Sequence, residues 1–368
     1  MKIVLTGGGT GGHFYPLIAI AENLKKVALS EKIIDLDLFY FGSKIFDADS
    51  LFDNNISFVE VPAGRFTIAE FPKAIIGIFT ALWQLYKVYP DLVIGKGGFD
   101  SLPTLVAAFI LRIPVLIHES DSIPGKVNQL AGKFAKRVAV SFEEAGLYFK
   151  SEKIAWTGQP IRKEIILPAK EGFFEYFKLN PGLPTILVLG GSQGADAINE
   201  IILEALPRLV EKYQIIHQVG PKNLEEIKIR IETILSKSAD KERYLPIGSL
   251  NPLGLKMAAG VAKLVISRAG SMIFEIAVWG LPSIIIPLPS AHADHQRKNA
   301  FNYARAGACI VVDETNLSDD LLIGEIEGIF TNPIKMDNLK AGAAKFARRD
   351  AGGVIAREAL AIATRHEK

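Results

Sequence analysis

The segment KIVLTGGGTGGH at residues 2–13 carries the strongest structural signal in this 368-residue sequence. Its first five residues have an apolar centre, Ile3 to Leu5, and the length of a buried strand, and the glycines that follow predict a tight turn. From Pro16 to Leu24 the pattern predicts a helix. A strand, a glycine turn and a helix in this order place backbone N–H groups where a phosphate or a sugar can approach.

The same pattern restarts in the second half of the chain. Apolar residues 185–189 run into GGSQGAD at 190–196, and a helix is predicted over 197–213. Further strands are expected at 36–41, 57–61, 92–94, 115–118 and 137–140, and then at 215–218, 264–267, 283–287 and 309–312. Helical patterns separate these strands, which predicts parallel sheets covered by helices on both faces.

The length also favours two domains, because single domains cluster near ~100–200 residues. We expect the α/β class, with two facing Rossmann-like doubly wound domains and a deep cleft between them, since ligands bind beyond the carboxyl ends of such strands. We place the first domain at 1–158 and the second at 159–345. Residues 157–181 form the expected connector, and a helix within 346–368 is expected to pack back on the first domain.

Composition argues against several classes of protein. Apolar residues make up 49% and charged residues 22% of the chain, which is typical of a globular protein. The net charge is +2, and residues 1–158 hold 16 basic and 16 acidic side chains, so we expect no nucleic-acid partner. Cys309 alone cannot form an internal disulfide, and no leader-type segment opens the sequence, so we expect a cytoplasmic location.

The glycines at 7–12 match the spacing of the dinucleotide fingerprint. A dinucleotide site also needs an acidic residue at the end of the second strand. That strand ends YFGS at 40–43, and Asp35 and Asp37 lie at its start. The pattern therefore disfavours a nicotinamide or flavin enzyme and keeps the loop as a site for phosphate or sugar.

Two further candidate anion sites occur in the second half. The loop GGSQG at 190–194 adds a hydroxyl and an amide to a second glycine turn. The segment SRAGS at 267–271 follows an apolar strand and precedes a helix that carries Glu275. This carboxylate could accept the hydroxyls of a ribose, or it could stabilise the helix dipole as a first-turn glutamate.

A group of titratable residues, HESD at 118–121, ends another apolar strand. It places an imidazole beside two carboxylates where a general base would be needed, although a buried structural cluster explains the pattern equally well. Arg162, in GQPIR at 158–162, could reach a diphosphate as a charge-assisted partner.

Seven segments, taken in chain order, resemble those of one family. They are GGTGGH at 8–13, GGF at 97–99, HE at 118–119, PIR at 160–162, GGSQG at 190–194, RAG at 268–270 and HQ at 295–296. The family is that of the N-acetylglucosaminyltransferases that make lipid II in bacterial cell-wall synthesis. The resemblance covers nearly the whole chain, and seven ordered segments are far more specific than any one of them.

The resemblance implies a GT-B fold and an inverting transfer of N-acetylglucosamine without a metal or other cofactor. The donor would be UDP-GlcNAc, and the acceptor would be the C4 hydroxyl of undecaprenyl-diphospho-MurNAc-pentapeptide, known as lipid I. The first domain would serve the acceptor and the second the donor. The enzyme would lie peripherally on the cytoplasmic face of the cell membrane.

The resemblance also implies which residues form the site. Thr10, Gly11 and Gly12 would lie against the sugar and diphosphate, and Arg162 and Ser192 would bind the diphosphate. The other donor contacts would be Ile247 near the uracil, Ser271 and Met272 at the phosphate-binding helix, Glu275 at the ribose, His295 and Gln296 at the sugar hydroxyls, and Asp121 at the donor sugar.

The chain departs from the family at the HESD segment, where His-Glu-Gln-Asn is common, and at Phe99, where a tyrosine is common. The candidates for the general base are His13, Glu119 and Asp121, and we favour His13 or Glu119 because each matches the family at its position. Two alternative functions stay open. One is a UDP-GlcNAc 2-epimerase, which uses no lipid acceptor, and the other is a non-catalytic nucleotide-sugar-binding subunit.

Residues 71–89 predict a helix with one broad apolar face. This face consists of Ile75, Ile76, Phe79, Leu82, Trp83 and Tyr86. The opposite face is hardly polar, so the helix is either packed beneath the first sheet or lies against a membrane. We favour a peripheral membrane contact near the acceptor site, in which Lys73 and Lys87 would add attraction to anionic lipid.

Overall fold

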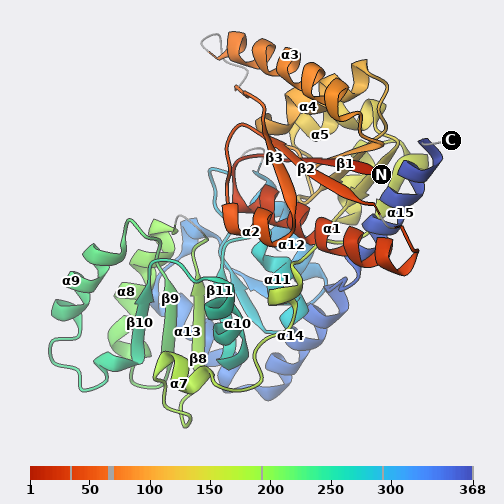
Figure 1. Ribbon diagram of the computed structural model, residues 1–368. Coiled ribbons are helices and arrows are strands. Elements are labelled where there is room, and N and C mark those ends of the chain that lie inside the picture. Colours follow the sequence, from red (N-terminus) through yellow and green to blue (C-terminus); the bar gives the residue numbers. More distant parts are fainter. Residues whose placement is uncertain (34, 65–69, 192–193, 292–293, 367–368) are drawn as a thin grey trace. The chain divides into compact units, whose positions relative to one another are not determined.

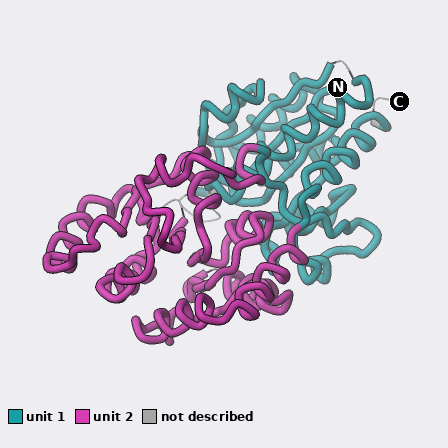
Figure 2. The backbone as a smooth tube through the Cα atoms, turned by 90° about the horizontal axis from the view of Figure 1, so that it is seen from below, with its two compact units in different colours: residues 1–163, 348–368 teal, residues 164–347 magenta. Residues whose placement is uncertain are grey.

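Two compact units make up the chain, and each is built around one parallel sheet (Figures 1 and 2). The computed structural model describes all residues except 34, 65–69, 192–193, 292–293 and 367–368. Unit 1 comprises Met1–Lys163 and Arg348–Lys368, and unit 2 comprises Glu164–Ala347. The chain therefore leaves unit 1 once, builds unit 2, and returns to unit 1 for its last helix.

Unit 1 contains a seven-stranded sheet in the order β3-β2-β1-β4-β5-β6-β7. Its strands are β1 (Lys2–Thr6), β2 (Asp37–Gly42), β3 (Ile56–Glu60), β4 (Leu92–Gly95), β5 (Val115–Glu119), β6 (Arg137–Val140) and β7 (Ile154–Trp156). All pairings between them are parallel. The strand order reverses between β1 and β4, which is the position where doubly wound sheets bind ligands.

Helices cover both faces of this sheet. They are α1 (Gly11–Ser30), α2 (Ala48–Asp53), α3 (Phe71–Val88), α4 (Leu102–Ile110), α5 (Lys126–Phe134) and α15 (Ala351–His366). Successive residues of β1 point to opposite faces. Ile3 and Leu5 share a core with α1 and α15, whereas Val4 shares one with α3, α4 and α5.

Unit 2 contains a six-stranded parallel sheet in the order β10-β9-β8-β11-β12-β13. Its strands are β8 (Thr185–Leu189), β9 (Gln214–Gln218), β10 (Tyr244–Ile247), β11 (Ala262–Ser267), β12 (Ser283–Ile285) and β13 (Cys309–Val311). The helices are α7 (Phe173–Phe177), α8 (Asp196–Leu209), α9 (Leu224–Ile234), α10 (Pro252–Val261), α11 (Met272–Trp279), α12 (His295–Arg305), α13 (Asp319–Phe330) and α14 (Pro333–Phe346). One face of the sheet packs with α8, α9, α13 and α14 in a single hydrophobic core.

Several element boundaries differ from those expected. α1 begins at Gly11 instead of Pro16, so its first turn contains glycines and His13. Strand β12 ends at Ile285, before the expected residue 287, and β7 and β10 were not expected. The connector at 157–181 contains two short helices, α6 (Lys163–Ile166) and α7, and unit 1 extends beyond residue 158 to Lys163.

Candidate functional site

Two glycine loops of unit 1 meet at the carboxyl ends of β1 and β4. Gly98 has a φ of +79°, and a Cβ built on it would lie 2.8 Å from the Cα of Gly8. No side chain tolerates so short a contact with backbone, so glycine is required for this approach. The structure thereby brings the segment at 97–99, one of the seven that resemble the family, against the first glycine loop.

His13 lies in the first turn of α1, at the end of that loop. Thr10 occupies the N-cap position, but its hydroxyl makes no capping hydrogen bond. Instead, its Oγ1 lies 2.8 Å from Nδ1 of His13. Thr10 is exposed, and Gly11, Gly12 and His13 are half-buried. The predicted contacts of this loop are therefore accessible, and the imidazole is oriented by a hydroxyl.

Glu119, the last residue of β5, is only 4% exposed. Its Oε1 accepts a hydrogen bond from the N–H of Asp121 at 2.9 Å. Its Oε2 accepts from the N–H of Gly125 at 3.1 Å and from Nδ2 of Asn128 at 2.9 Å. Burial raises the pKa of Glu119, the charge of Asp121 adds to this, and Lys96 opposes it. This carboxylate therefore fixes the segment after β5, in which Asp121 is half-buried.

His118 is fully buried and has a structural environment. Its Nε2 lies 3.1 Å from the carbonyl oxygen of Gly158 and 3.2 Å from Oγ of Ser141. Burial lowers the pKa of His118 well below its usual range, and the charge of Lys96 lowers it further. The ring is therefore neutral at neutral pH, and it ties β5 to the segment that leads out of unit 1.

Arg162 belongs to unit 1, although the sequence analysis placed it with the second domain. Its guanidinium carbon lies 3.8 Å from the centroid of the Tyr15 ring, on α1. A cation over an aromatic face is held in a defined orientation. Arg162 is therefore positioned by the helix that carries His13.

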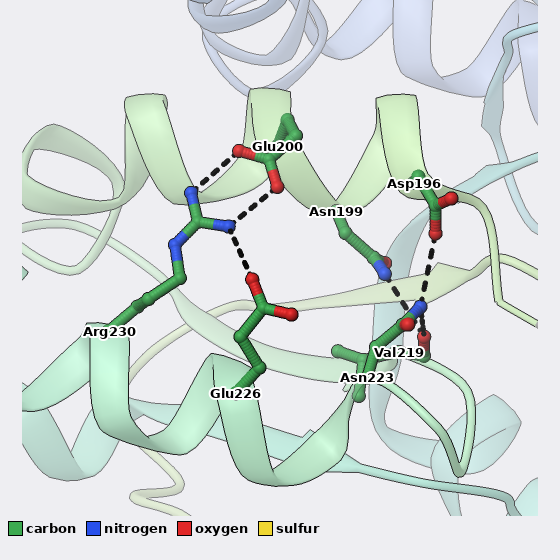
Figure 3. Close-up of polar contacts among 7 residues, drawn as sticks. All are labelled: Asp196, Asn199, Glu200, Val219, Asn223, Glu226 and Arg230. Atoms are coloured by element: carbon green, nitrogen blue, oxygen red, sulfur yellow. Dashed lines mark hydrogen bonds and ion pairs between the residues drawn. The ribbon is translucent and has the colours of Figure 1, made fainter.

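In unit 2 the glycine loop after β8 is held by the turn after β9 (Figure 3). Gly194 has a φ of +83°, and a Cβ built on it would lie 2.2 Å from the carbonyl oxygen of Val219. Asn199 and Asn223 both donate their side-chain amides to that same oxygen at 3.0 Å. Ser192 lies outside the described residues, but the end of its loop is fixed by these contacts.

The helices behind this loop are clamped together by side chains that Figure 3 shows. Arg230 on α9 donates to both carboxylate oxygens of Glu200 on α8 at 2.6 Å, and Glu226 lies 3.7 Å away. Asn223 also donates to Asp196 at 3.2 Å. Such exposed pairs add little stability, but a bidentate pair fixes the orientation of α9 against α8.

Gln218 was missed by the sequence analysis. It is the last residue of β9, and its Nε2 donates to the carbonyl oxygen of Gly191 at 2.8 Å. Its Oε1 accepts from the N–H of Leu250 at 3.1 Å. Gln218 thus links the glycine loop to the segment after β10. Its partner in the sheet is Ile247, the last residue of β10 and the predicted uracil contact. A polar residue at the end of an apolar strand was the available signal.

The start of α11 holds three of the predicted donor contacts. Ser271 is the N-cap residue, Met272 is the first helical residue, and Glu275 lies in the first turn. All three are half-buried. A Cβ built on Gly270 would meet nothing within 4 Å, so the approach to this helix start is open on that side. The structure is therefore compatible with the predicted phosphate contacts at Ser271 and Met272 and with the predicted ribose contact at Glu275.

His295 and Gln296 begin α12, and both are half-buried. Oε1 of Gln296 accepts from the N–H of Leu288 at 3.1 Å. From the same helix, Asn299 donates to the carbonyl oxygen of Ala269 at 3.1 Å. This bond places α12 beside the loop that leads to α11. The predicted donor contacts of unit 2 that the structure describes thus gather around the carboxyl edge of its sheet.

The chain matches two domains of known families. The glycosyltransferase family 28 N-terminal domain matches residues 3–140, and its C-terminal domain matches residues 185–352. A relative from Desulforamulus reducens is 34% identical over 370 residues, which cover 95% of this chain and 96% of the relative. One from Halothermothrix orenii is 36% identical over 351 residues, covering 90% and 91%. Both carry the name UDP-N-acetylglucosamine–N-acetylmuramyl-(pentapeptide) pyrophosphoryl-undecaprenol N-acetylglucosamine transferase.

Solved structures share the fold. MurG of Acinetobacter baumannii has a TM-score of 0.74 at 24% identity and covers 98% of this chain and 99% of its own. A UDP-GlcNAc 2-epimerase from Neisseria meningitidis, solved with UDP-GlcNAc, has a TM-score of 0.72 at 15% identity and covers 98% and 100%. Identities this low speak for the fold alone, so they do not favour the epimerase alternative.

The expected α/β fold of two Rossmann-like domains is confirmed by the two sheets and by these likenesses. The resemblance read from the seven segments is confirmed by the family domains and by relatives aligned over nearly the whole chain. The chain is therefore a glycosyltransferase, and it belongs to glycosyltransferase family 28 and, within it, to the family of the UDP-N-acetylglucosamine–N-acetylmuramyl-(pentapeptide) pyrophosphoryl-undecaprenol N-acetylglucosamine transferases.

Proposed function

We propose that this chain transfers N-acetylglucosamine from UDP-GlcNAc to the C4 hydroxyl of undecaprenyl-diphospho-MurNAc-pentapeptide, with inversion at the anomeric carbon. The observation that carries the proposal is the match to transferases of that name over 90–95% of the chain. This match spans both units, and therefore it includes the unit proposed to bind the acceptor and the unit proposed to bind the donor.

Unit 2 is proposed to bind the donor. The start of α11 presents N–H groups and a helix dipole, which stabilise the negative charge that develops on the departing diphosphate. Glu275 would accept the ribose hydroxyls, Ile247 would lie near the uracil, and His295 and Gln296 would contact the sugar. Ser192 and Arg162 complete the proposed set on the diphosphate.

Unit 1 is proposed to supply the general base and the acceptor site. His13 is the base that the geometry favours, because its half-buried ring is held by Thr10 at 2.8 Å. The ring would take the proton of the C4 hydroxyl as the oxygen attacks the anomeric carbon, and UDP would leave with the electron pair of the broken bond. Glu119 has its oxygens committed to three hydrogen bonds, which supports a structural use instead.

We further propose that α3 and α4 bind the cytoplasmic face of the membrane. The predicted face of α3 is exposed except for Leu82, which is half-buried; Phe79 is 67% and Trp83 57% exposed. Ala81 and Leu85 of the same helix are buried, so this helix has one core face and one apolar face in contact with solvent. Among the described residues, no helix is long and apolar enough to span a bilayer.

Positive charge accompanies this face. The ammonium nitrogen of Lys87 lies 4.9 Å from the centroid of the Trp83 ring. Lys73, in the first turn of α3, and Arg112, two residues after the end of α4, are exposed. Apolar side chains next to basic ones are typical of a surface that binds anionic lipid. An enzyme whose acceptor is tethered to a lipid requires such a contact.

One assay tests the proposed reaction. Purified protein is incubated with labelled UDP-GlcNAc and a short-chain lipid I analogue, with and without EDTA. We expect a disaccharide product in both conditions and none without the acceptor. Conversion of the donor without acceptor would identify an epimerase. UDP binding without any turnover would support the binding subunit.

A further inference from the structure

A buried lysine in unit 1 has no role in the family resemblance. Lys96 directly follows β4, and its N–H donates to the carbonyl oxygen of Thr6 at 2.9 Å, which continues the pairing of β4 with β1. The side chain is 2% exposed. A lysine this deep is uncommon, because an ammonium group is costly to remove from water unless it is paired.

The ammonium group of Lys96 points into the segment after β5. Its Nζ donates to Oγ of Ser120 at 2.5 Å. Ser120 donates in turn to Oε1 of Gln159 at 2.6 Å, and Ser141 donates to the same oxygen at 2.9 Å. The chain of hydrogen bonds therefore joins the end of β4, the segment after β5 and the residues that lead out of unit 1.

Two carboxylates flank Ser120, and both act on the same ammonium group. Burial lowers the pKa of Lys96, whereas the charges of Glu119 and Asp121 raise it. A further titratable group beside Lys96 is His118, whose pKa is lowered by burial and by the charge of Lys96, so that its ring is neutral at neutral pH. A lysine in this position thus balances negative charge that would otherwise be left in a buried site.

We propose that Lys96 is a positioning residue for the transfer reaction: its ammonium group holds Ser120 and so fixes the segment at 119–125 that carries Asp121. This inference rests on the proposed function for its effect on turnover. Lys96 is too deeply buried to touch a substrate, so it acts through Ser120 and through the charge of Glu119. The carboxylate of Glu119 then fixes the N–H groups of Asp121 and Gly125.

The test compares Lys96→Met and Ser120→Ala with a matched control, Lys25→Met. Methionine is one atom shorter than lysine, so it keeps most of the apolar stem and removes the ammonium group. Lys25 is a partly buried lysine of unit 1, and it donates to the carbonyl oxygen of Asn54 instead of to the candidate site. Ser120→Ala removes only a hydroxyl, so it reports on the same chain of bonds if Lys96→Met does not fold.

Hydrogen–deuterium exchange of the free protein is the first measurement. We expect the amides of Asp121 and Gly125 to exchange at least ~10-fold faster in both site variants, with no change in the sheet and no such change in the control. We expect kcat to fall by ~100-fold in Lys96→Met, the size of effect that a small misplacement produces, while UDP affinity changes less than ~2-fold. The double variant should be no worse than the worse single variant.

The two proposals fail separately. If the unaltered protein transfers no sugar, the proposed function is wrong, and exchange still tests the role of Lys96. If both site variants keep the exchange and kcat of the unaltered protein, Lys96 is an ordinary core residue. Equal losses in Lys25→Met would likewise overturn the proposal.

Discussion

At the scale of single residues, the environments of Glu119 and His13 distinguish the two general-base candidates that we favoured. Glu119 is buried and accepts three hydrogen bonds, whereas His13 is half-buried and its Nδ1 lies beside the hydroxyl of Thr10. A general base needs access to the proton that it removes, so the geometry favours His13. The sequence could not rank them because each matches the family.

We therefore predict that His13→Ala lowers kcat by ~100-fold or more and leaves UDP affinity and the melting temperature nearly unchanged. Glu119→Gln should lower the melting temperature together with kcat, because an amide cannot accept from all three donors that fix the segment at 119–125. Steady-state kinetics measure kcat, and calorimetry measures UDP affinity and the melting temperature. Asp121→Asn is the control and should be tolerated. Loss of turnover in Asp121→Asn, with activity kept in the other two variants, would make Asp121 the base.

The buried ring of His217 should make the stability of unit 2 depend on pH. Its Nδ1 lies 2.8 Å from the hydroxyl of Tyr244, and burial lowers the pKa of His217 to about 3. The unfolded imidazole binds a proton near pH 6.5, but the folded one does not. The stability from the neutral ring is therefore complete above pH 6.5 and is lost as the pH falls toward 3.

Between pH 7 and pH 4.5 this contribution should lower the free energy of unfolding by about 2–3 kcal/mol. We expect His217→Gln to lose that part of the pH dependence in denaturant titrations of unit 2. Tyr244→Phe keeps the imidazole and should keep the dependence. Equal pH dependence in His217→Gln and the unaltered protein would show that this ring does not control it.

At the scale of elements, α3 shows how one helix can be apolar on two sides without being fully buried. Ala81 and Leu85 pack in the core of unit 1, while Ile76 and Phe79 remain exposed. From the sequence alone, the whole helix could equally have been packed beneath the sheet. The exposed face shows that the whole helix does not lie beneath the sheet, so that alternative is wrong for this face.

Replacing Ile75, Phe79 and Trp83 together by serine should reduce sedimentation with anionic vesicles and leave the melting temperature nearly intact, since none of them is buried. The control replaces three other exposed apolar residues, Leu29, Phe52 and Ile229, by serine. Vesicle binding should survive in the control. A large fall in melting temperature with unchanged vesicle binding would place the membrane surface elsewhere.

At the scale of the whole molecule, the end of the chain completes the core of its beginning. Ile355, Ala359 and Leu360 of α15 are buried with α1 and with residues of β1 and β2. The guanidinium carbon of Arg348 lies 3.5 Å from the centroid of the Trp156 ring, where the chain re-enters unit 1. Unit 1 therefore cannot finish folding until unit 2 has been synthesised.

Leu360→Ala should accordingly destabilise unit 1 by about 2–5 kcal/mol, because a buried leucine leaves a cavity. Val354→Ala, on the exposed side of the same helix, should cost less than about 0.5 kcal/mol. Denaturant titration with hydrogen–deuterium exchange as the readout would show whether the loss of stability lies in unit 1. Similar losses in the two variants would mean that α15 contributes through helix formation alone.

Local signals in the sequence were sufficient for most of the two sheets. The expected strands at 137–140 and 185–189 have the same bounds as β6 and β8. An apolar run is a strong signal because burial depends on residue type, and a glycine after the run, as after β8, adds to it because it permits a tight turn. β7 and β10 were missed because they are short strands at sheet edges, and the last two residues of β7 are exposed.

The family, and the sheet edge at which most of the described candidate residues lie, were thus readable from the chain alone. The tertiary structure decided that Glu119 is held by three donors, that Arg162 lies on Tyr15 in unit 1, and that Lys96 is buried against Ser120. Residue type and spacing encode the strand, turn and helix next to each residue. The environment of a charged side chain depends on groups far away in the chain, which meet only when the sheet and its helices have packed.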